Sequence, residues 1–459
     1  MGLLFLVLFV LSEIALVVLS FTKWSEKSKF LKNRVLVIVS ELLILLLVVV
    51  LPTTYMKWRF VCALVVLTVR CGFSVISYFA KRNKVQGEVK KPARIVSCVV
   101  VTLMIAFSLM PSFMFSNYNG LDTTGEFEIK ECNAILVDDS RVDEFENDGS
   151  KREVPVHFYY PEAQGEFPLV VFSHGAFGYY QSNYSTYAEL ASNGYIVVAL
   201  DHPHHAFFTT DTSSNTVIVD TEFFEDAMNL GNLEYKNADE TFETIKNWME
   251  IRTADGNFVL DTIKQAKSND TLDKNWGTED SDEILSVLSM TDTDKIGFLG
   301  HSMGGATAVS LGRERDDIDA VIDLDGSMLS EIESYENGEF QYESVPYPLP
   351  LLDFRKEEDY NEMEQMRSDG TYKDNYMFGI AYVNNYVVEN AENAQSVVFK
   401  YAGHMDFTDL PMFSPFLGSM LGSGDVDNEE FMYTVNGIIL NWFDYYLKDE
   451  GSLNIKATY

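Results

Sequence analysis

The sequence contains a serine whose surroundings fit nucleophilic catalysis. Ser302 stands at the centre of a G-x-S-x-G pattern in the stretch GFLGHSMGGA, residues 297–306. A β-type apolar run precedes the pattern and a helix-like run follows it, which is the order of a nucleophile elbow. Gly300 and Gly304 allow the tight turn that exposes the hydroxyl. A serine hydroxyl is a poor nucleophile until a base removes its proton, so the chain must also supply a base, an acid and oxyanion donors.

Chain order identifies the base. In the α/β-hydrolase arrangement the histidine follows the acid and the last strand. Of the seven histidines, only His404 satisfies this order, because it lies in YAGHMDF directly after the apolar run 397–401. A loop at a strand end can carry an imidazole over the serine.

The acid has two candidates. Asp325 in VIDLDGSM and Asp353 in LPLLDF each end a strand-like run after the serine. The acid must hold the imidazole in the correct tautomer and stabilise its charged form. Asp323 points to the opposite side of its strand from the residue next to it and fits a role in packing or at the end of the sheet. Spacing alone does not separate Asp325 from Asp353.

Two backbone amides are candidates for an oxyanion hole. Acyl transfer needs donors aimed at the oxygen on which negative charge develops. One is the N–H of Met303, the residue after the serine. The other is expected from the loop after an earlier strand, where VVFSHGAFG places Gly175 in a turn and offers the N–H of Ala176.

A histidine-rich stretch raises the alternative of a metal site. DHPHH at residues 201–205 has zinc-binding residue types, but Pro203 and the adjacent His204 and His205 give poor spacing for ligands on one face. We interpret it as a loop lining the pocket. Cys132 is the one cysteine outside the apolar N-terminal region, which excludes a cysteine-based zinc site. We therefore expect neither a metal nor an organic cofactor.

The elements that must position these residues alternate between strands and helices. Strand-like runs recur at 154–160, 168–172, 195–200, 295–299, 320–324, 349–352 and 397–401, and helical patterns occupy 184–192, 257–266, 303–311 and 430–447. Such alternation predicts an α/β domain with a mainly parallel sheet flanked by helices. Residues 118–149 look like an acidic lead-in without strong periodicity. Long insertions near 207–250 and 328–395 are either lids or solvated additions.

Residues 1–117 differ in kind from the rest of the chain. Apolar stretches at about 2–21, 35–51, 60–80 and 95–115 approach the length that crosses a bilayer, so four transmembrane helices are predicted. The loops between the first and second and between the third and fourth stretches are rich in Lys and Arg, which places them inside. Everything after Phe115 is then extracytoplasmic. Glu13, Glu41 and Arg70 lie within the stretches, where pairing in the bundle offsets the cost of burial.

Charge separates the same two regions. Residues 1–117 hold 14 Lys and Arg against 4 Asp and Glu, whereas residues 118–459 carry a formal charge of −45. Such an acidic surface argues against nucleic acid as a partner. An outer domain that lacks a cysteine pair favours a bacterial cell surface over a secretory lumen.

With these residues assembled, residues 150–447 resemble the plasma-type platelet-activating factor acetylhydrolase family of α/β-hydrolases. The resemblance rests on FSHGAFG, GYIVVALDHPHH, RTADGNFVLDTI, IGFLGHSMGGATA, VIDLDGSM and GHMDFTDLP. It implies Ser302 as nucleophile, Asp325 as acid, His404 as base, and Ala176 and Met303 as oxyanion donors, with Asp353 the second candidate for the acid. The four apolar stretches and the enlarged insertion before His404 depart from the family pattern.

The sequence therefore predicts a multi-pass protein of the cell membrane, with residues 1–117 as its transmembrane region and 118–459 as an extracytoplasmic α/β-hydrolase domain. Its expected activity is hydrolysis of carboxylic esters, lipid or short-acyl, through an acyl-enzyme intermediate. The alternatives are an amidase or peptidase, an acyltransferase with the same triad, or a catalytically silent binding or sensing module. The sequence carries no signal for an oligomeric state.

Overall fold

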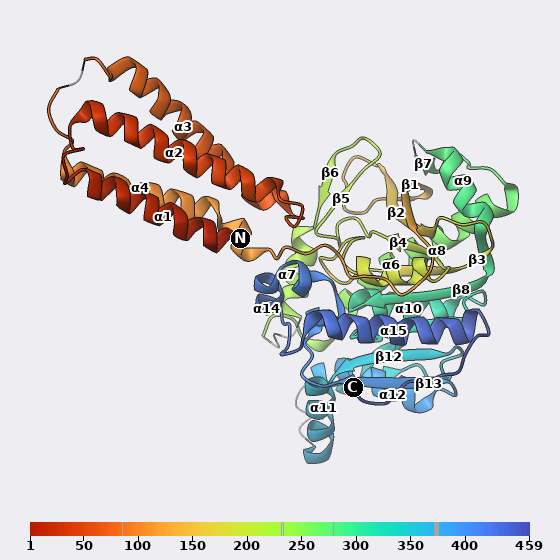
Figure 1. The fold of residues 1–459 in the computed structure, drawn as a ribbon. Coiled ribbons are helices and arrows are strands. Elements are labelled where there is room, and N and C mark those ends of the chain that lie inside the picture. The colour runs from red at the N-terminus through yellow and green to blue at the C-terminus, as the bar shows by residue number, and fades with distance from the viewer. Residues whose placement is uncertain (85, 231, 233, 279, 371–375) are drawn as a thin grey trace. The chain divides into compact units, whose positions relative to one another are not determined.

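The computed structural model describes residues 1–84, 86–230, 232, 234–278, 280–370 and 376–459 (Figure 1). The chain divides into two compact units. The first comprises Met1–Asn119 together with Leu410–Met420, and the second comprises Gly120–Asp409 together with Leu421–Tyr459. A short segment near the C-terminus thus packs with the N-terminal helices rather than with its neighbours in sequence.

The first unit is built on four apolar helices. They are α1 (Gly2–Leu19), α2 (Lys27–Val50), α3 (Val61–Lys81) and α4 (Lys91–Ser108), with the short helices η1 (Lys57–Phe60) and α5 (Met110–Met114) beside them. All four are long and apolar enough to cross a membrane. Large apolar side chains such as Phe73 and Phe107, 71% and 75% exposed, point outward. An apolar exterior of this kind fits a lipid environment.

The ionisable residues of the four helices are paired inside this unit. Arg70 Nη1 lies 2.8 Å from Glu41 Oε2, and a second Arg70 nitrogen is ion-paired with Glu13. Arg94, at the start of α4, also pairs with Glu13. The predicted pairing of Glu13, Glu41 and Arg70 is confirmed, with Arg94 as a further member. Each buried carboxylate thereby has a compensating cation.

The segment Leu410–Met420 joins this unit through backbone and ring contacts. It forms α13 (Leu410–Phe413) and α14 (Pro415–Met420). The N–H of Ser116 donates to the Phe413 carbonyl at 2.9 Å, and Ser414 Oγ donates to the Met114 carbonyl at 2.7 Å. The Phe115 ring lies 4.9 Å from the Trp58 ring and 5.1 Å from the Phe413 ring. Hydrogen bonds and aromatic packing together hold the segment in place.

The second unit contains a nine-stranded sheet of order β13-β12-β9-β8-β3-β4-β2-β1-β7. Its strands are β1 (Ile129–Val142), β2 (Lys151–Pro161), β3 (Phe167–Ser173), β4 (Ile196–Leu200), β7 (Trp276–Gly277), β8 (Thr291–His301), β9 (Ala320–Leu324), β12 (Leu351–Lys356) and β13 (Ala394–Phe399). The strands from β13 to β4 pair in parallel, whereas β2, β1 and β7 join antiparallel. The mainly parallel sheet predicted from the alternating pattern is confirmed.

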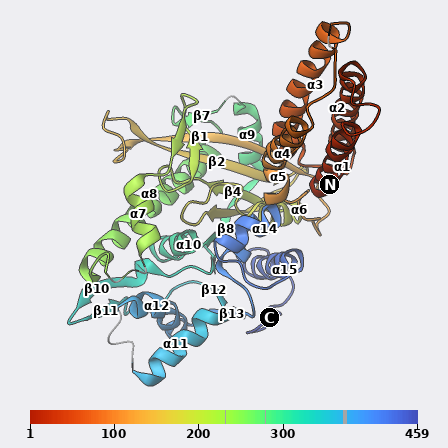
Figure 2. The same ribbon diagram turned by 90° about the vertical axis from the view of Figure 1, so that its left-hand side faces the viewer.

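Helices cover both faces of this sheet. Figure 2 shows α6 (Tyr184–Ser192) and α15 (Asn428–Leu447) on one face, with α8 (Ala238–Asn269), α10 (Met303–Glu314) and α12 (Met377–Asn390) on the other. Every residue of β4 and β9 is buried, which explains why β4 is continuously apolar rather than alternating and why β9 is apolar apart from Asp323. The carboxyl ends of the parallel strands therefore meet at one edge, where the candidate site residues lie.

Smaller elements fill the predicted insertions. Residues 207–250 include β5 (Phe208–Thr210), β6 (Thr216–Ile218), α7 (Thr221–Asn229) and the start of α8; residues 328–395 include η2 (Leu329–Glu331), β10 (Ile332–Glu336), β11 (Glu339–Tyr342), β12, α11 (Glu357–Asp369) and α12. Helix α9 (Ser281–Met290) precedes β8. Residues 231, 233 and 371–375 of these insertions lie outside the described residues.

The interpretation of residues 118–149 as an acidic lead-in is wrong for β1. This strand pairs with β2 over most of its length, and Cys132, Ala134 and Leu136 face the core while their neighbours are more exposed. The alternation was concealed because Ile135 and Val137, on the other face, are also apolar, so residues 134–137 form a continuous apolar run. A strand with one buried face needs apolar residues only at every second position.

Candidate active site

Ser302 lies on a strained turn between β8 and α10. Its φ of 56° and ψ of −124° are rare for a residue with a side chain, and its N–H donates to the Leu324 carbonyl at 2.9 Å. The structure thus gives this serine the sharp strand-to-helix turn expected of a nucleophile elbow. Strain held by surrounding structure is a common feature of functional sites.

Glycines let the backbone pack closely around this turn. A Cβ on Gly304 would lie 1.9 Å from the Ser173 carbonyl oxygen, so α10 can approach the end of β3 only without a side chain there. A Cβ on Gly175 would lie 3.1 Å from the Ser302 Cβ. The loop after β3, which carries the predicted oxyanion donor, therefore lies directly against the serine.

His404 and Asp325 are hydrogen-bonded to each other. His404 stands in the short helix η4 (His404–Phe407), and its Nδ1 lies 2.6 Å from Asp325 Oδ2. The Lys356 N–H donates to the other carboxylate oxygen at 3.1 Å. Burial favours a higher pKa for Asp325, but the hydrogen bond and charge of His404, together with the charge and N–H of Lys356, outweigh burial and lower the pKa. The carboxylate therefore stays ionised beside the imidazole.

The other two aspartates have different partners. Asp353 Oδ2 accepts from Ser396 Oγ at 2.7 Å, and its Oδ1 accepts from the Asn384 amide at 2.9 Å. Asp323 is fully buried and accepts from the Gly326 N–H at 2.9 Å. Of the two candidate acids, the structure brings only Asp325 to His404.

Within the described residues Ser302 and His404 share no hydrogen bond, but His301, next to the serine in sequence, contacts His404. Ser302 Oγ makes no hydrogen bond to another described residue, whereas the adjacent His301 contacts His404 directly. His301 Nε2 lies 3.0 Å from the His404 carbonyl oxygen, and the two rings are 4.6 Å apart. Burial, and secondly the charge of His404, lower the pKa of His301 to about 3, so its ring is neutral and donates from Nε2. Sequence reasoning did not single out His301, although its position beside the serine was a signal.

Within the described residues, the loop after β3 leaves the Ala176 amide without an acceptor, whereas the two amides that follow it are bonded. The N–H of Phe177, at φ 62°, donates to the His205 carbonyl at 3.0 Å, and the N–H of Gly178 donates to the Gly175 carbonyl at 3.0 Å. Among the described residues, no acceptor bonds the Ala176 N–H. The N–H of Met303 belongs to the first turn of α10, where helices provide no internal acceptor.

The histidines of the stretch 201–205 turn to different partners. His202 Nδ1 lies 3.0 Å from Asp255 and its Nε2 lies 2.9 Å from Ser173 Oγ. His205 Nδ1 accepts from Arg252 at 3.2 Å, and the His204 ring stacks on Phe145. Rather than converging on one point, the rings tie the loop after β4 to the body of the domain.

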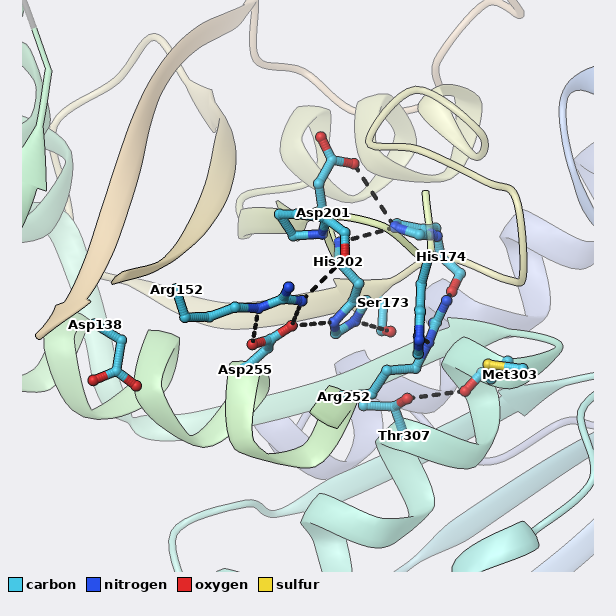
Figure 3. Close-up of polar contacts among 12 residues, drawn as sticks. Asp138, Arg152, Ser173, His174, Asp201, His202, Arg252, Asp255, Met303 and Thr307 are labelled. Carbon is cyan, nitrogen blue, oxygen red and sulfur yellow. Dashed lines mark hydrogen bonds and ion pairs between the residues drawn. The ribbon is translucent and has the colours of Figure 1, made fainter. Parts of the chain in front are cut away.

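A buried polar network, which sequence reasoning missed, lies beneath the loop after β3 (Figure 3). Asp255 of α8 accepts two hydrogen bonds from Arg152 of β2, at 2.7 and 3.1 Å, and one from His202. Arg252, one turn earlier on α8, donates to the His174 carbonyl at 2.6 Å. All four side chains are fully or almost fully buried. In the sequence, the only signal for this network was a pair of charged residues three positions apart, Arg252 and Asp255, in a buried helix.

Asp201 lies beside this network and is expected to make the stability of the folded chain depend on pH. Burial raises its pKa to about 8, from an ordinary value of 3.8. The folded chain keeps the proton up to about pH 8 whereas the unfolded chain loses it near pH 4, so unfolding becomes more favourable as pH rises between these values. Asp201→Asn removes this proton release while Asn can still accept from the Tyr180 N–H.

We expect the midpoint of thermal unfolding of Asp201→Asn, followed by near-ultraviolet circular dichroism, to exceed that of the parent by a few degrees at pH 8 and to match it at pH 3.5. A gain of equal size at both pH values would contradict the buried neutral carboxyl.

Comparison with known proteins places the chain in a family. The family model described as platelet-activating factor acetylhydrolase, isoform II, matches residues 150–453. The chain is 24% identical over 311 residues to platelet-activating factor acetylhydrolase of Cavia porcellus, covering 64% of this chain and 61% of the relative. It is 30% identical over 209 residues to that of Canis lupus familiaris, covering 42% of each. The matches thus span less than two thirds of these relatives' length.

A solved structure supports the fold. The ferulic acid esterase from Streptomyces cinnamoneus superposes with a TM-score of 0.51 at 19% identity, covering 73% of this chain and 94% of the esterase. At this identity the likeness concerns the fold, and it agrees with the predicted α/β-hydrolase arrangement of a mainly parallel sheet between helices. Since the family model covers well over half of the sequence, the chain belongs to the platelet-activating factor acetylhydrolase, isoform II, family.

Proposed function

We propose that the chain is a membrane-anchored serine hydrolase that cleaves carboxylic esters. The observation that carries this proposal is the 2.6 Å hydrogen bond between His404 and Asp325, next to a serine on a strained strand-to-helix turn. Family membership supports the same reaction class, because the relatives are named as acetylhydrolases. Acetyl and other short-acyl esters are therefore the first substrates to test.

In the proposed reaction, Ser302 is the nucleophile and His404 the general base. Because His404 Nδ1 donates to Asp325, its Nε2 is left as the proton acceptor. Ser302 Oγ bonds to the ester carbonyl carbon as its proton passes to Nε2, and the alcohol leaves with that proton. Water then attacks the acyl-enzyme with His404 again as base, releasing the acid and restoring Ser302. The Ser302–His404 hydrogen bond is expected to form when substrate binds, as is common in unliganded hydrolases.

The oxyanion is proposed to bind the amides of Ala176 and Met303. Both N–H groups are unused within the described chain, and the loop carrying Ala176 packs against Ser302. Hydrogen-bond donors that are already in place stabilise the transition state without any rearrangement of the protein. This stabilisation accounts for a large share of the rate enhancement in this reaction class.

The test is covalent labelling of the full-length protein in detergent with a fluorophosphonate probe, followed by identification of the labelled peptide. We expect the label on Ser302 and hydrolysis of p-nitrophenyl acetate by the same preparation, with much slower cleavage of p-nitroacetanilide. A folded protein that takes up no label, or takes it up at another residue, would refute the assignment.

We also propose that the hydrolase unit lies outside the cytoplasmic membrane. Four helices of sufficient length and the basic residues of two loops support this topology. Intact cells treated with a membrane-impermeant fluorophosphonate should label the protein as fully as lysed cells do. Labelling only after lysis would show that the hydrolase unit lies on the cytoplasmic side. It would leave the proposed reaction at Ser302 unaffected.

A further inference from the structure

We propose that Arg252 and His174 are positioning residues that hold the Gly175 carbonyl and thereby direct the Ala176 amide toward Ser302. The inference rests on the proposed function, since it concerns the predicted oxyanion donor. It concerns two side chains outside the predicted catalytic set, one of them 50 residues before the serine on another element.

The Gly175 carbonyl is bonded from several sides. His174 Nδ1 lies 2.6 Å from this oxygen, the Gly178 N–H donates to it at 3.0 Å, and Arg252 Nη2 lies 3.5 Å away. Arg252 Nη1 also donates to the preceding carbonyl, that of His174, at 2.6 Å. The guanidinium therefore spans two successive peptide groups of the loop.

Holding this oxygen fixes the amide on the same peptide. The Gly175 carbonyl and the Ala176 N–H belong to one planar trans peptide unit, so they point in opposite directions. When the oxygen is held by donors from the interior, the N–H must face the other way. Gly175 itself lies against Ser302. The same donors polarise the peptide, which makes its N–H a stronger donor.

The surroundings fix both side chains in the required state. The His202 N–H donates to His174 Nε2 at 3.1 Å, so the neutral His174 ring carries its proton on Nδ1, where it faces Gly175. Burial strongly lowers the pKa of His174, which keeps it neutral. Burial also lowers the pKa of Arg252, to about 9, and nearby Asp255 acts in the opposite direction, so the guanidinium stays charged at neutral pH.

Paired substitutions separate positioning from packing. His174→Asn keeps an N–H near the position of Nδ1, whereas His174→Gln places its N–H near that of Nε2. Arg252→Lys keeps the charge with a single donor centre, and Arg252→Met removes both. We expect kcat for p-nitrophenyl acetate to fall about 10- to 100-fold in His174→Gln and Arg252→Met, with KM within about twofold. His174→Asn and Arg252→Lys should recover at least part of the loss.

Inhibitors report on the oxyanion directly. A trifluoromethyl ketone adds to the serine and places an oxyanion in the hole, whereas the corresponding secondary alcohol does not. We expect the inhibition constant of the ketone to rise in parallel with the loss of kcat/KM, and that of the alcohol to stay within about twofold. Arg313→Met is the matched control, because it removes a bidentate pair with Glu331 elsewhere in the unit. It should lower thermal stability without lowering kcat.

The outcomes are distinguishable. Parent-like kcat in both Arg252 variants and His174→Gln, or an equal loss of affinity for ketone and alcohol, would overturn the positioning role. If Arg252→Met does not fold, the comparison of kcat between His174→Asn and His174→Gln decides whether the positioning role holds. Failure of the parent protein to hydrolyse esters or to label at Ser302 would instead refute the proposed function.

Discussion

Replacing Ser302 by alanine is expected to lower kcat for p-nitrophenyl acetate by about 10⁶-fold, the loss seen when a serine nucleophile is removed from a complete triad. The remaining groups can still bind the ester and stabilise the oxyanion, but no acyl-enzyme forms. Fluorophosphonate labelling should vanish with the activity. Active-site titration and initial rates on the purified full-length chain give both numbers.

Ser310→Ala is the matched control for this variant. Ser310 lies on the same helix, α10, and is buried, where its hydroxyl accepts from Thr253 at 3.0 Å. Its loss should lower stability modestly and leave kcat within about twofold. Undiminished labelling of Ser302→Ala would mean that a different residue carries the chemistry.

The second large effect is expected from Asp325→Asn, which should lower kcat by about 10⁴-fold. An amide nitrogen in place of the carboxylate favours the wrong imidazole tautomer and does not stabilise the cation that forms on His404. The loss should appear mainly in kcat, because Asp325 lies behind the imidazole and is nearly inaccessible, its side chain only 6% exposed. Steady-state kinetics on a soluble short-acyl ester measures it.

Asp353→Asn tests the alternative acid. Burial raises the pKa of Asp353, and the side chain hydrogen-bonds to Ser396 and Asn384 rather than to His404. We expect kcat of this variant to remain within about threefold of the parent, with any loss confined to stability. A large loss of kcat in Asp353→Asn, together with parent-like kcat in Asp325→Asn, would reverse the assignment of the acid.

The ambiguity between these two aspartates illustrates where sequence reasoning reaches its limit. Asp323 and Asp353 are register partners on the adjacent parallel strands β9 and β12, and Asp325 follows two residues beyond Asp323. Each therefore lies near the same sheet edge, which chain order can predict. Which carboxylate meets His404 depends on how the backbone turns after β9, where Asp325 has a φ of 54°. Only the family resemblance pointed to Asp325 before the structure.

Other elements could be predicted where the residue pattern that specifies them lies within one short segment of sequence. The run 184–192 and the helix after the serine carry complete local patterns, and both form helices close to the predicted bounds. The network of Arg152, Arg252 and Asp255 was not predictable in this way. Its members come from β2 and α8, about 100 residues apart, and charged residues in a helix ordinarily face solvent. Only the assembled tertiary structure shows that they are buried together.

The placement of residues 410–420 has a consequence for proteolytic separation of the two units. The chain passes between the two units three times, after Asn119, after Asp409 and after Met420. A protease that cuts only the first connection would leave the second unit attached to the first, because residues 410–420 remain packed with the N-terminal helices. Separating the second unit from the first therefore requires extraction of α13 and α14 as well, or a second pair of cuts that would sever the chain just beyond His404.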